Sequence, residues 1–258
     1  MNRRLLLVGA LVATVAFAGC SWVAETPEST PASSDTDSAE HAIPVFRLDG
    51  HASALANTSY ALDIETRALK AQQRANRTIT VRSNRSAKRF LLHNEIGNRS
   101  LTRYVNETAI YSRVVRNGTT NYTVQSLSAV PVNFSQIHRR AIQRDRLTTV
   151  YRVASFEKTD NATEDGRRYT EFTLENTTLS PNATVESSAG RITIRDDDVI
   201  DRAFVDISGG ESGAPFHMLV DYRTTRTEDV SVAAPTWLDD AVAASAANAT
   251  AGTTTAAN

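Results

Sequence analysis

An alternation of apolar and polar residues, repeated through the middle of the chain, constrains the fold more than any other feature. Successive residues of a β-strand point to opposite faces, so a period of two predicts strands with one buried face. The runs 77–81 and 216–222 are clear examples, and Asn117-Gly118 between two further runs is a hairpin turn signal. About ten such segments, mostly consecutive, predict an α+β fold that is mainly antiparallel β.

Two segments have helical rather than strand periodicity. A short helix is expected over 51–55, and a longer one over 133–147, where Phe134, Ile137 and Ala141 share one face. Residues 150–156 are expected to form the strand that follows. The chain has a single Cys, so no internal disulfide framework supports this fold.

The N-terminus has the layout of an export signal. Arg3 and Arg4 precede an apolar run over 5–18, and the run is shorter than the roughly 20 residues of a stable membrane span. The arginine pair fits a twin-arginine signal. Residues 17–20 resemble a lipobox, which implies a lipid on Cys20 and a location at the outer face of the cytoplasmic membrane. The alternative is an ordinary signal with an incidental cysteine.

Acceptor triplets for N-glycosylation are unusually frequent. Twelve of the fifteen Asn residues stand in Asn-X-Ser/Thr, far above what the Ser and Thr content gives by chance. They are Asn57, Asn76, Asn84, Asn98, Asn106, Asn117, Asn121, Asn133, Asn161, Asn176, Asn182 and Asn248. They indicate a glycosylated surface protein, although a composition rich in Asn, Thr and Ser also produces such triplets.

Composition divides the chain into four parts. A signal over 1–20 is followed by an acidic tether over 21–45, rich in Ser, Thr and Pro, with five acidic residues and no basic one. The β-rich domain is expected over 46–238. A tail of Ala, Thr and Asn over 239–258 is expected to be disordered, with a frayed helical turn over 238–246 as the alternative.

Charge is unevenly distributed within the expected domain. Residues 47–152 contain 18 Lys or Arg and 6 Asp or Glu, whereas residues 153–240 contain 8 and 18. The favoured interpretation is two sheet regions that attract each other within the monomer. A basic face that meets anionic lipid headgroups or glycans, or a dimer of complementary faces, stays open.

This order of elements resembles the LolA/LppX/LprG-like carriers. The resemblance implies an unclosed, curved half-barrel sheet with one or two helices on its concave side, above an apolar cavity. The signal, the tether, the triplets and Pro235-Thr236-Trp237 are also similar to haloarchaeal surface lipoproteins. The net charge of −1 departs from the acidic excess usual in haloarchaeal proteins.

No constellation typical of catalysis or metal binding is found in the sequence. The five His residues lack ligand spacing, and Asp196 to Asp198 with Asp201 indicate a solvated turn rather than a calcium loop. The Gly-rich run 208–213 lacks the spacing of a phosphate-binding loop. We therefore expect no enzyme activity, no catalytic residue, no metal, no cofactor and no nucleic-acid partner; the oligomeric state is left open.

The sequence thus predicts a lipid-anchored extracytoplasmic protein that holds or shuttles a lipid or another apolar ligand. The alternating residues expected to line the cavity are Ile79, Val81, Phe90, Leu92, Phe216, Met218 and Val220. These residues would equally suit a filled core. The alternative function is a structural or adhesive surface glycoprotein without a ligand cavity.

Overall fold

A computed structural model describes residues 46–164 and 166–254, all within one compact unit over Ser38–Asn258. Eleven strands form one sheet in the order β6-β5-β4-β3-β2-β1-β11-β10-β9-β8-β7. The strands are β1 (Tyr60–Lys70), β2 (Gln73–Asn84), β3 (Arg89–Ile96), β4 (Arg99–Val105), β5 (Ala109–Arg116), β6 (Thr119–Ser126), β7 (Ala154–Glu164), β8 (Arg167–Thr177), β9 (Ala183–Arg195), β10 (Ile200–Glu211) and β11 (Ala214–Thr227). The helices are α1 (Phe46–Ala56), α2 (Phe134–Arg140), α3 (Arg144–Val153), α4 (Leu238–Thr254) and a 3₁₀ turn over Leu127–Ala129.

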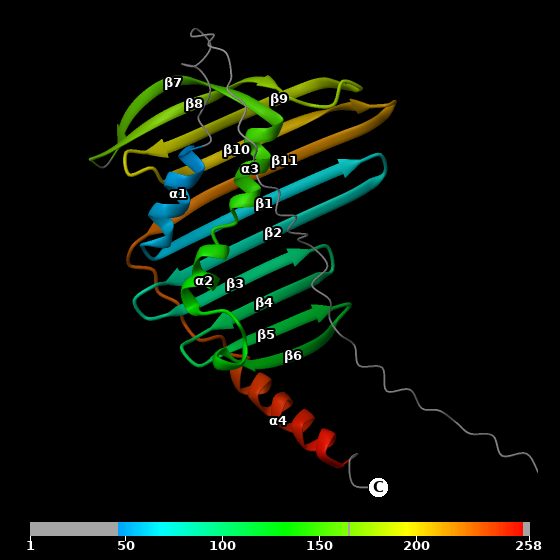
Figure 1. Ribbon diagram of the computed structural model, residues 1–258. Helices are drawn as coiled ribbons and strands as arrows, with labels where there is room; N and C mark the ends of the chain where they lie inside the picture. The colour runs from blue at the N-terminus through cyan, green and yellow to red at the C-terminus, as the bar shows by residue number, and fades with distance from the viewer. Residues whose placement is uncertain (1–45, 165, 255–258) are drawn as a thin grey trace, which may run out of the picture. The chain divides into compact units, whose positions relative to one another are not determined.

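Two sets of antiparallel hairpins build the sheet. Strands β1 to β6 run outward from the centre on one side and β11 to β7 on the other, and β1 pairs with β11 in the middle (Figure 1). Strands β6 and β7 are the two edges and do not pair with each other within the described residues. The curved sheet is therefore not closed, which confirms the predicted α+β half-barrel class.

The β5–β6 connection shows how the sequence sets the hairpins. Asn117 and Gly118 both have positive φ, 50° and 79°, as the predicted two-residue turn requires. The residues before and after the turn stay in register, with Arg116 opposite Thr119 and Val115 opposite Thr120.

Helices α1, α2 and α3 lie across one face of the sheet, here called the inner face (Figure 1). It carries the larger apolar core, to which β1 contributes Leu62 and Ile64 and α3 contributes Leu147 and Val150. Because Val150 faces this core from a helix, the expectation of a strand beginning at residue 150 is wrong; β7 begins at Ala154.

The predicted helix over 133–147 is two helices. Asn133 caps α2, since its side chain accepts from the backbone N–H of Gln136, whose own side chain accepts from the N–H of Asn133. Gln143 interrupts the run with φ 59°, in the left-handed region, and α3 then starts in a new direction. The break lets α2 and α3 follow the curvature of the sheet.

A smaller core lies on the opposite, outer face. The chain after β11 crosses that face and buries Val230, Val232 and Trp237, with Ala241 from α4, against Tyr104. Helix α4 occupies most of the segment expected to be a disordered tail and contains the helical turn over 238–246 that was the alternative, and burial of Trp237 and Ala241 gives its first turn a packing partner. Among the described residues, none of the helices has the length and apolar character needed to cross a bilayer.

Candidate ligand-binding face

All seven residues predicted to line a cavity lie on the inner face, in the larger apolar cluster. Ile79, Val81, Phe90 and Val220 are at most 3% exposed and form closed core. Leu92, Phe216 and Met218 are only partly buried. The alternation therefore placed all seven residues on one face, that of the larger core, and the three partly buried members mark where this core approaches the surface.

The helices cover only part of this face. In Figure 1 they cross the strands over their left-hand portion, and the strands continue to the right beyond them. Phe172 and Leu174 on β8 extend the partly buried apolar surface beyond Phe216 and Met218 on β11. Apolar side chains that are in contact with the core and still accessible are the kind of surface that receives an apolar ligand.

Three arginines stand on or over the same face. Arg103 on β4 pairs across the strands with Leu92, and Arg77 on β2 is two residues from Ile79, hence on the same side. Arg146 comes from the first turn of α3 and is close enough to Arg77 to act on its charge. All three are half-buried.

The hydrogen bonds of these arginines are few. Arg77 Nε donates to Asn94 Oδ1 at 2.8 Å, and Arg103 Nε approaches Ser112 Oγ at 3.5 Å. Arg146 Nε is buried without a hydrogen-bond partner among the described residues. Burial lowers the pKa of Arg77 and of Arg103, and the neighbouring charge of Arg146 lowers that of Arg77 further.

No carboxylate in the described part of the chain forms an ion pair with Arg77, Arg103 or Arg146. A partly desolvated cation usually has an anionic partner, because its own desolvation is costly. These three arginines were not among the residues predicted from the sequence to form a site. The alternation itself could have pointed to two of them, because Arg77 and Arg103 occupy positions in β2 and β4 where it predicts an inward-facing apolar residue.

Two buried histidines fix the helices over the face. The backbone N–H of Ile200 donates to His51 Nδ1 at 3.1 Å, so His51 Nε2 carries the proton and donates to Tyr222 Oη at 2.9 Å. Tyr222 in turn donates to the carbonyl of Ile142 at 3.0 Å. Burial is the main cause that lowers the pKa of His51 to about 3, which keeps the ring neutral.

The second histidine, His138 on α2, makes a similar connection. Its Nε2 donates to the carbonyl of Leu55 at 3.0 Å, and Nδ1 accepts from Ser83 Oγ at 2.7 Å. Tyr60 Oη donates to the carbonyl of His138. Burial lowers the pKa of His138 as well. The rings thus join α1, α2 and the sheet, which explains two of the five His residues as structural.

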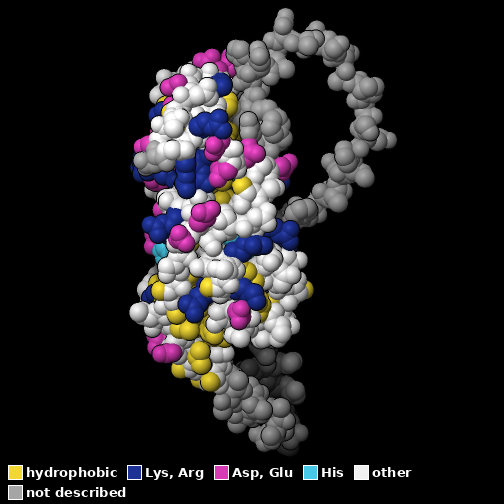
Figure 2. All heavy atoms as spheres, turned by 90° about the vertical axis from the view of Figure 1, so that its left-hand side faces the viewer, with side chains coloured by type: hydrophobic (Ala, Val, Ile, Leu, Met, Phe, Trp, Pro, Cys, Tyr) yellow, Lys and Arg dark blue, Asp and Glu magenta, His cyan; other side chains and the backbone are white. Residues whose placement is uncertain are grey.

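Three hollows are found in the described part of the chain that are not lined by Leu92, Phe216 or Met218. One, of about 630 Å³, includes Asp49, Arg139 and Arg144, and a second, of about 470 Å³, includes Lys88 and Glu107. Figure 2 shows Lys and Arg side chains spread over the side of the molecule that is on the left in Figure 1. Arg144 pairs with Asp49 at 2.6 Å and Lys88 with Glu107 at 3.2 Å. Arg85 and Arg139, which also line the first hollow, have no ion pair among the described residues, so that hollow keeps a positive charge.

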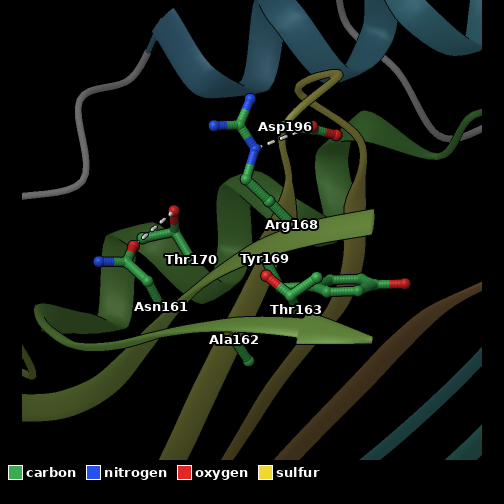
Figure 3. A pocket seen from close by; sticks show the side chains of 7 residues that line it. All are labelled: Asn161, Ala162, Thr163, Arg168, Tyr169, Thr170 and Asp196. Atoms are coloured by element: carbon green, nitrogen blue, oxygen red, sulfur yellow. Dashed lines mark hydrogen bonds and ion pairs between the residues drawn. The ribbon is translucent and has the colours of Figure 1, made fainter. Parts of the chain in front are cut away.

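A third hollow, of about 420 Å³, lies beside the β7–β8 hairpin (Figure 3). Arg168 points toward Asp196, with Nε 3.5 Å from Oδ2, and Thr170 Oγ1 donates to Asn161 Oδ1 at 3.4 Å. Its polar groups are engaged with one another, so we do not select it as the site. Asp196 and its two successors form the β9–β10 turn, as predicted, and Asp197 pairs with Arg195 at 2.8 Å.

Eleven of the twelve glycosylation triplets have an Asn whose side chain the structure describes. Nine of these Asn are exposed, and Asn84 and Asn106 are half-buried. Asn84 Nδ2 donates to the carbonyl of Val230 at 2.7 Å and is thus occupied in the fold. Arg3, Arg4, Cys20 and the tether over 21–45 lie outside the described residues, as does the side chain of Asn248.

The two oppositely charged halves are joined mainly through the β1–β11 pairing rather than through ion pairs. Lys70 Nζ and Glu211 Oε2, 3.1 Å apart, link them. The other ion pairs of the described residues lie within one half. No group of three or more His, Cys, Asp or Glu in the described residues is arranged to hold a metal ion.

Neither a protein-family model nor a curated protein matches the chain. Solved structures match at low identity. MucB is 11% identical, with a TM-score of 0.26, over 74% of this chain and 60% of that one. The complex of MucB with MucA(peri) is 14% identical, with a TM-score of 0.24, over 74% of this chain and 56% of that one. A DUF1329 family protein from Desulfovibrio piger ATCC 29098 is 9% identical, with a TM-score of 0.26, over 72% of this chain and 93% of that one. The chain thus spans about 60% of the length of MucB.

Proposed function

We propose that this protein is a lipid-anchored extracytoplasmic binding protein that holds or shuttles a lipid or another apolar ligand on its inner face, without catalysing a reaction. The observation that supports the proposal best is the partly buried apolar surface that β3, β8 and β11 contribute to the inner face. Leu92, Phe216 and Met218 remain partly accessible there although they belong to the main core. A rigid apolar surface beside a packed core offers a ligand contact area without reorganisation of the protein.

The anchoring part of the proposal rests on the sequence. Arg3 and Arg4, the apolar run and Cys20 form the signal and the lipidation site, and a twin-arginine route delivers the protein to the outer face of the cytoplasmic membrane. A binding protein held there meets membrane lipids directly.

Native mass spectrometry of detergent-free protein tests the binding. We expect a co-purifying lipid, or uptake of an added fluorescent fatty acid, and the double substitution Leu92→Gln with Met218→Gln should reduce uptake. The matched control is Leu91→Gln with Leu219→Gln, because these residues neighbour the first pair on β3 and β11 and point to the outer face. Absence of any bound lipid, or equal effects of the two variants, would refute the proposal.

A second candidate function is that of a structural or adhesive surface glycoprotein. The nine exposed Asn residues in acceptor triplets support it. It predicts that the inner face takes up no lipid and that loss of glycans disturbs assembly at the cell surface. The two functions therefore give opposite results in the lipid-uptake experiment.

A further inference from the structure

Arg77, Arg103 and Arg146 place positive charge within the inner face, where the strand register sets Arg77 between Leu92 on β3 and Met218 on β11. Arg103 pairs with Leu92, the partly buried residue of β3. Thr66 on β1 connects the other side, because it is opposite Arg77 on β2 and opposite Val220 on β11. The cations and the accessible apolar side chains thus belong to one continuous face.

Among the described residues, these cations have no counter-charge of their own. Within the described residues no ion pair involves them, and Arg146 Nε is a buried donor without a partner. Elsewhere in the described chain, two arginines with restricted exposure do find carboxylates: the buried Arg195 pairs with Asp197, and the half-buried Arg202 pairs with Asp221. Two nearby half-buried cations, Arg77 and Arg146, repel each other unless an anion lies between them.

The neighbouring polar groups suit an anionic head group. Asn94 orients Arg77 through its Oδ1, which leaves the outer guanidinium nitrogens of Arg77 available. Guanidinium groups bind phosphate and carboxylate oxygens through paired, charge-assisted hydrogen bonds. A ligand with such a head and an apolar chain would satisfy both parts of the face.

We propose that the ligand of the inner face is an anionic lipid, whose phosphate or carboxylate head is bound by Arg77, Arg103 and Arg146 while its chain lies along Leu92, Phe216 and Met218. This inference rests on the proposed function and specifies its ligand class. The head group accounts for the three cations, and the chain accounts for the accessible apolar side chains.

The test is a competition between two lipids with the same acyl chain. Detergent-free protein is mixed with equimolar lysophosphatidylglycerol, which carries a phosphate, and the corresponding monoacylglycerol, which is neutral, and the bound species are compared by native mass spectrometry. We expect preferential binding of the anionic lipid. The triple substitution Arg77→Gln, Arg103→Gln and Arg146→Gln should reduce that preference about tenfold or more, since each lost charge-assisted contact weakens binding.

The matched control is the triple substitution of Arg74, Arg89 and Arg226 by Gln. These arginines are exposed, have no ion pair among the described residues and lie on β2, β3 and β11. The control changes the net charge by the same amount, so a general electrostatic effect would appear in both variants. Thermal unfolding of each variant confirms folding, and single Arg→Gln substitutions replace the triple variant if it does not fold.

The outcomes separate the two proposals. Equal binding of both lipids, unchanged in the inner-face variant, would overturn the anionic-lipid inference and leave a neutral apolar ligand. Binding of neither lipid would overturn the proposed function itself. Displacement of lysophosphatidylglycerol by equimolar inorganic phosphate would also overturn the inference, because a small soluble anion would then be the ligand.

Discussion

At the scale of single residues, the two buried histidines show how much of the inner face depends on neutral rings. His51 accepts from Ile200 and donates to Tyr222, and its pKa is lowered to about 3. The unfolded chain protonates this histidine below its ordinary pKa of about 6.5, whereas the folded chain does not. Falling pH therefore stabilises the unfolded state relative to the folded one.

We expect the free energy of unfolding to decrease between pH 6.5 and pH 4, with His51 contributing up to about 1.4 kcal/mol per pH unit. His138, whose pKa is also lowered, adds a loss in the same direction. The substitution His51→Gln should lower the stability at pH 7.5 by about 1–3 kcal/mol and make the pH dependence shallower. Urea denaturation at a series of pH values measures both effects.

The control for this prediction is Tyr222→Phe. It removes the hydroxyl that accepts from His51 and donates to Ile142, so it should also reduce stability. The histidine itself remains and still titrates in the unfolded chain. A pH dependence of the same steepness in the wild type and in His51→Gln would contradict the assignment.

Sequence patterns reached some residues and not others. Period-two alternation placed Ile79 and Met218 on the same, core-facing side of the sheet, because side-chain direction in a strand is a local property. The same pattern did not identify Arg103, because a charged residue at a position where the alternation predicts an apolar one only weakens the pattern. That Arg103 has no carboxylate partner among residues 46–164 and 166–254 is a result of packing, which no local pattern contains.

At the scale of elements, β10 shows how a glycine permits close strand packing. The β9–β10 register shifts between Ser208 and Gly209, and a Cβ at Gly209 would lie 1.9 Å from the carbonyl oxygen of Thr184. A Cβ added at Gly210, the next residue, would have its nearest neighbour 3.9 Å away. The bulge thus requires a glycine at one position only.

The substitution Gly209→Ala should destabilise the protein by about 2 kcal/mol or more, since the backbone of β9 must move away. Gly210→Ala should change the stability by less than about 0.5 kcal/mol. Thermal unfolding of both variants checks the difference. Similar unfolding temperatures for the two variants would show that the bulge tolerates a side chain.

Element boundaries were predictable where a turn signal marks them, as at Asn117-Gly118. They were not predictable at Gln143, because nothing in this residue type announces a left-handed conformation. Residues 150–153 were assigned to a strand, since a short apolar run fits both periods. The segment is helical because a helix lets Leu147 and Val150 be buried together on one side, against the core beneath α3.

At the scale of the whole molecule, the predicted class of fold is confirmed, while the pairing of β1 with β11 was beyond the sequence. Hairpins follow from turns, but a contact between segments more than a hundred residues apart depends on the complete set of strands. The signal, the tether and the lipidated cysteine stay predictions, because they lie outside the described residues.

The substitution Cys20→Ser tests the anchor. Loss of the only thiol in the chain prevents lipid attachment, so we expect the protein to move from the membrane fraction to the medium. Immunoblotting of the two fractions measures the distribution, with Ser21→Ala as a control that leaves the thiol in place. Retention of Cys20→Ser in the membrane would indicate that an uncleaved signal helix is the anchor.

The central pairing of β1 with β11 also has a kinetic consequence. During synthesis, β1 is the first strand to be made, whereas β11, with which it pairs, is the last. The β1–β11 pairing therefore cannot form until nearly the whole domain has been synthesised. The hairpins of β1 to β6 and those of β7 to β10 can form early from local contacts, but the two sets are joined only when β11, the last strand, pairs with β1. A chain truncated before Ala214 would leave two long unpaired strand edges, those of β1 and β10, and we expect it to aggregate rather than fold in part.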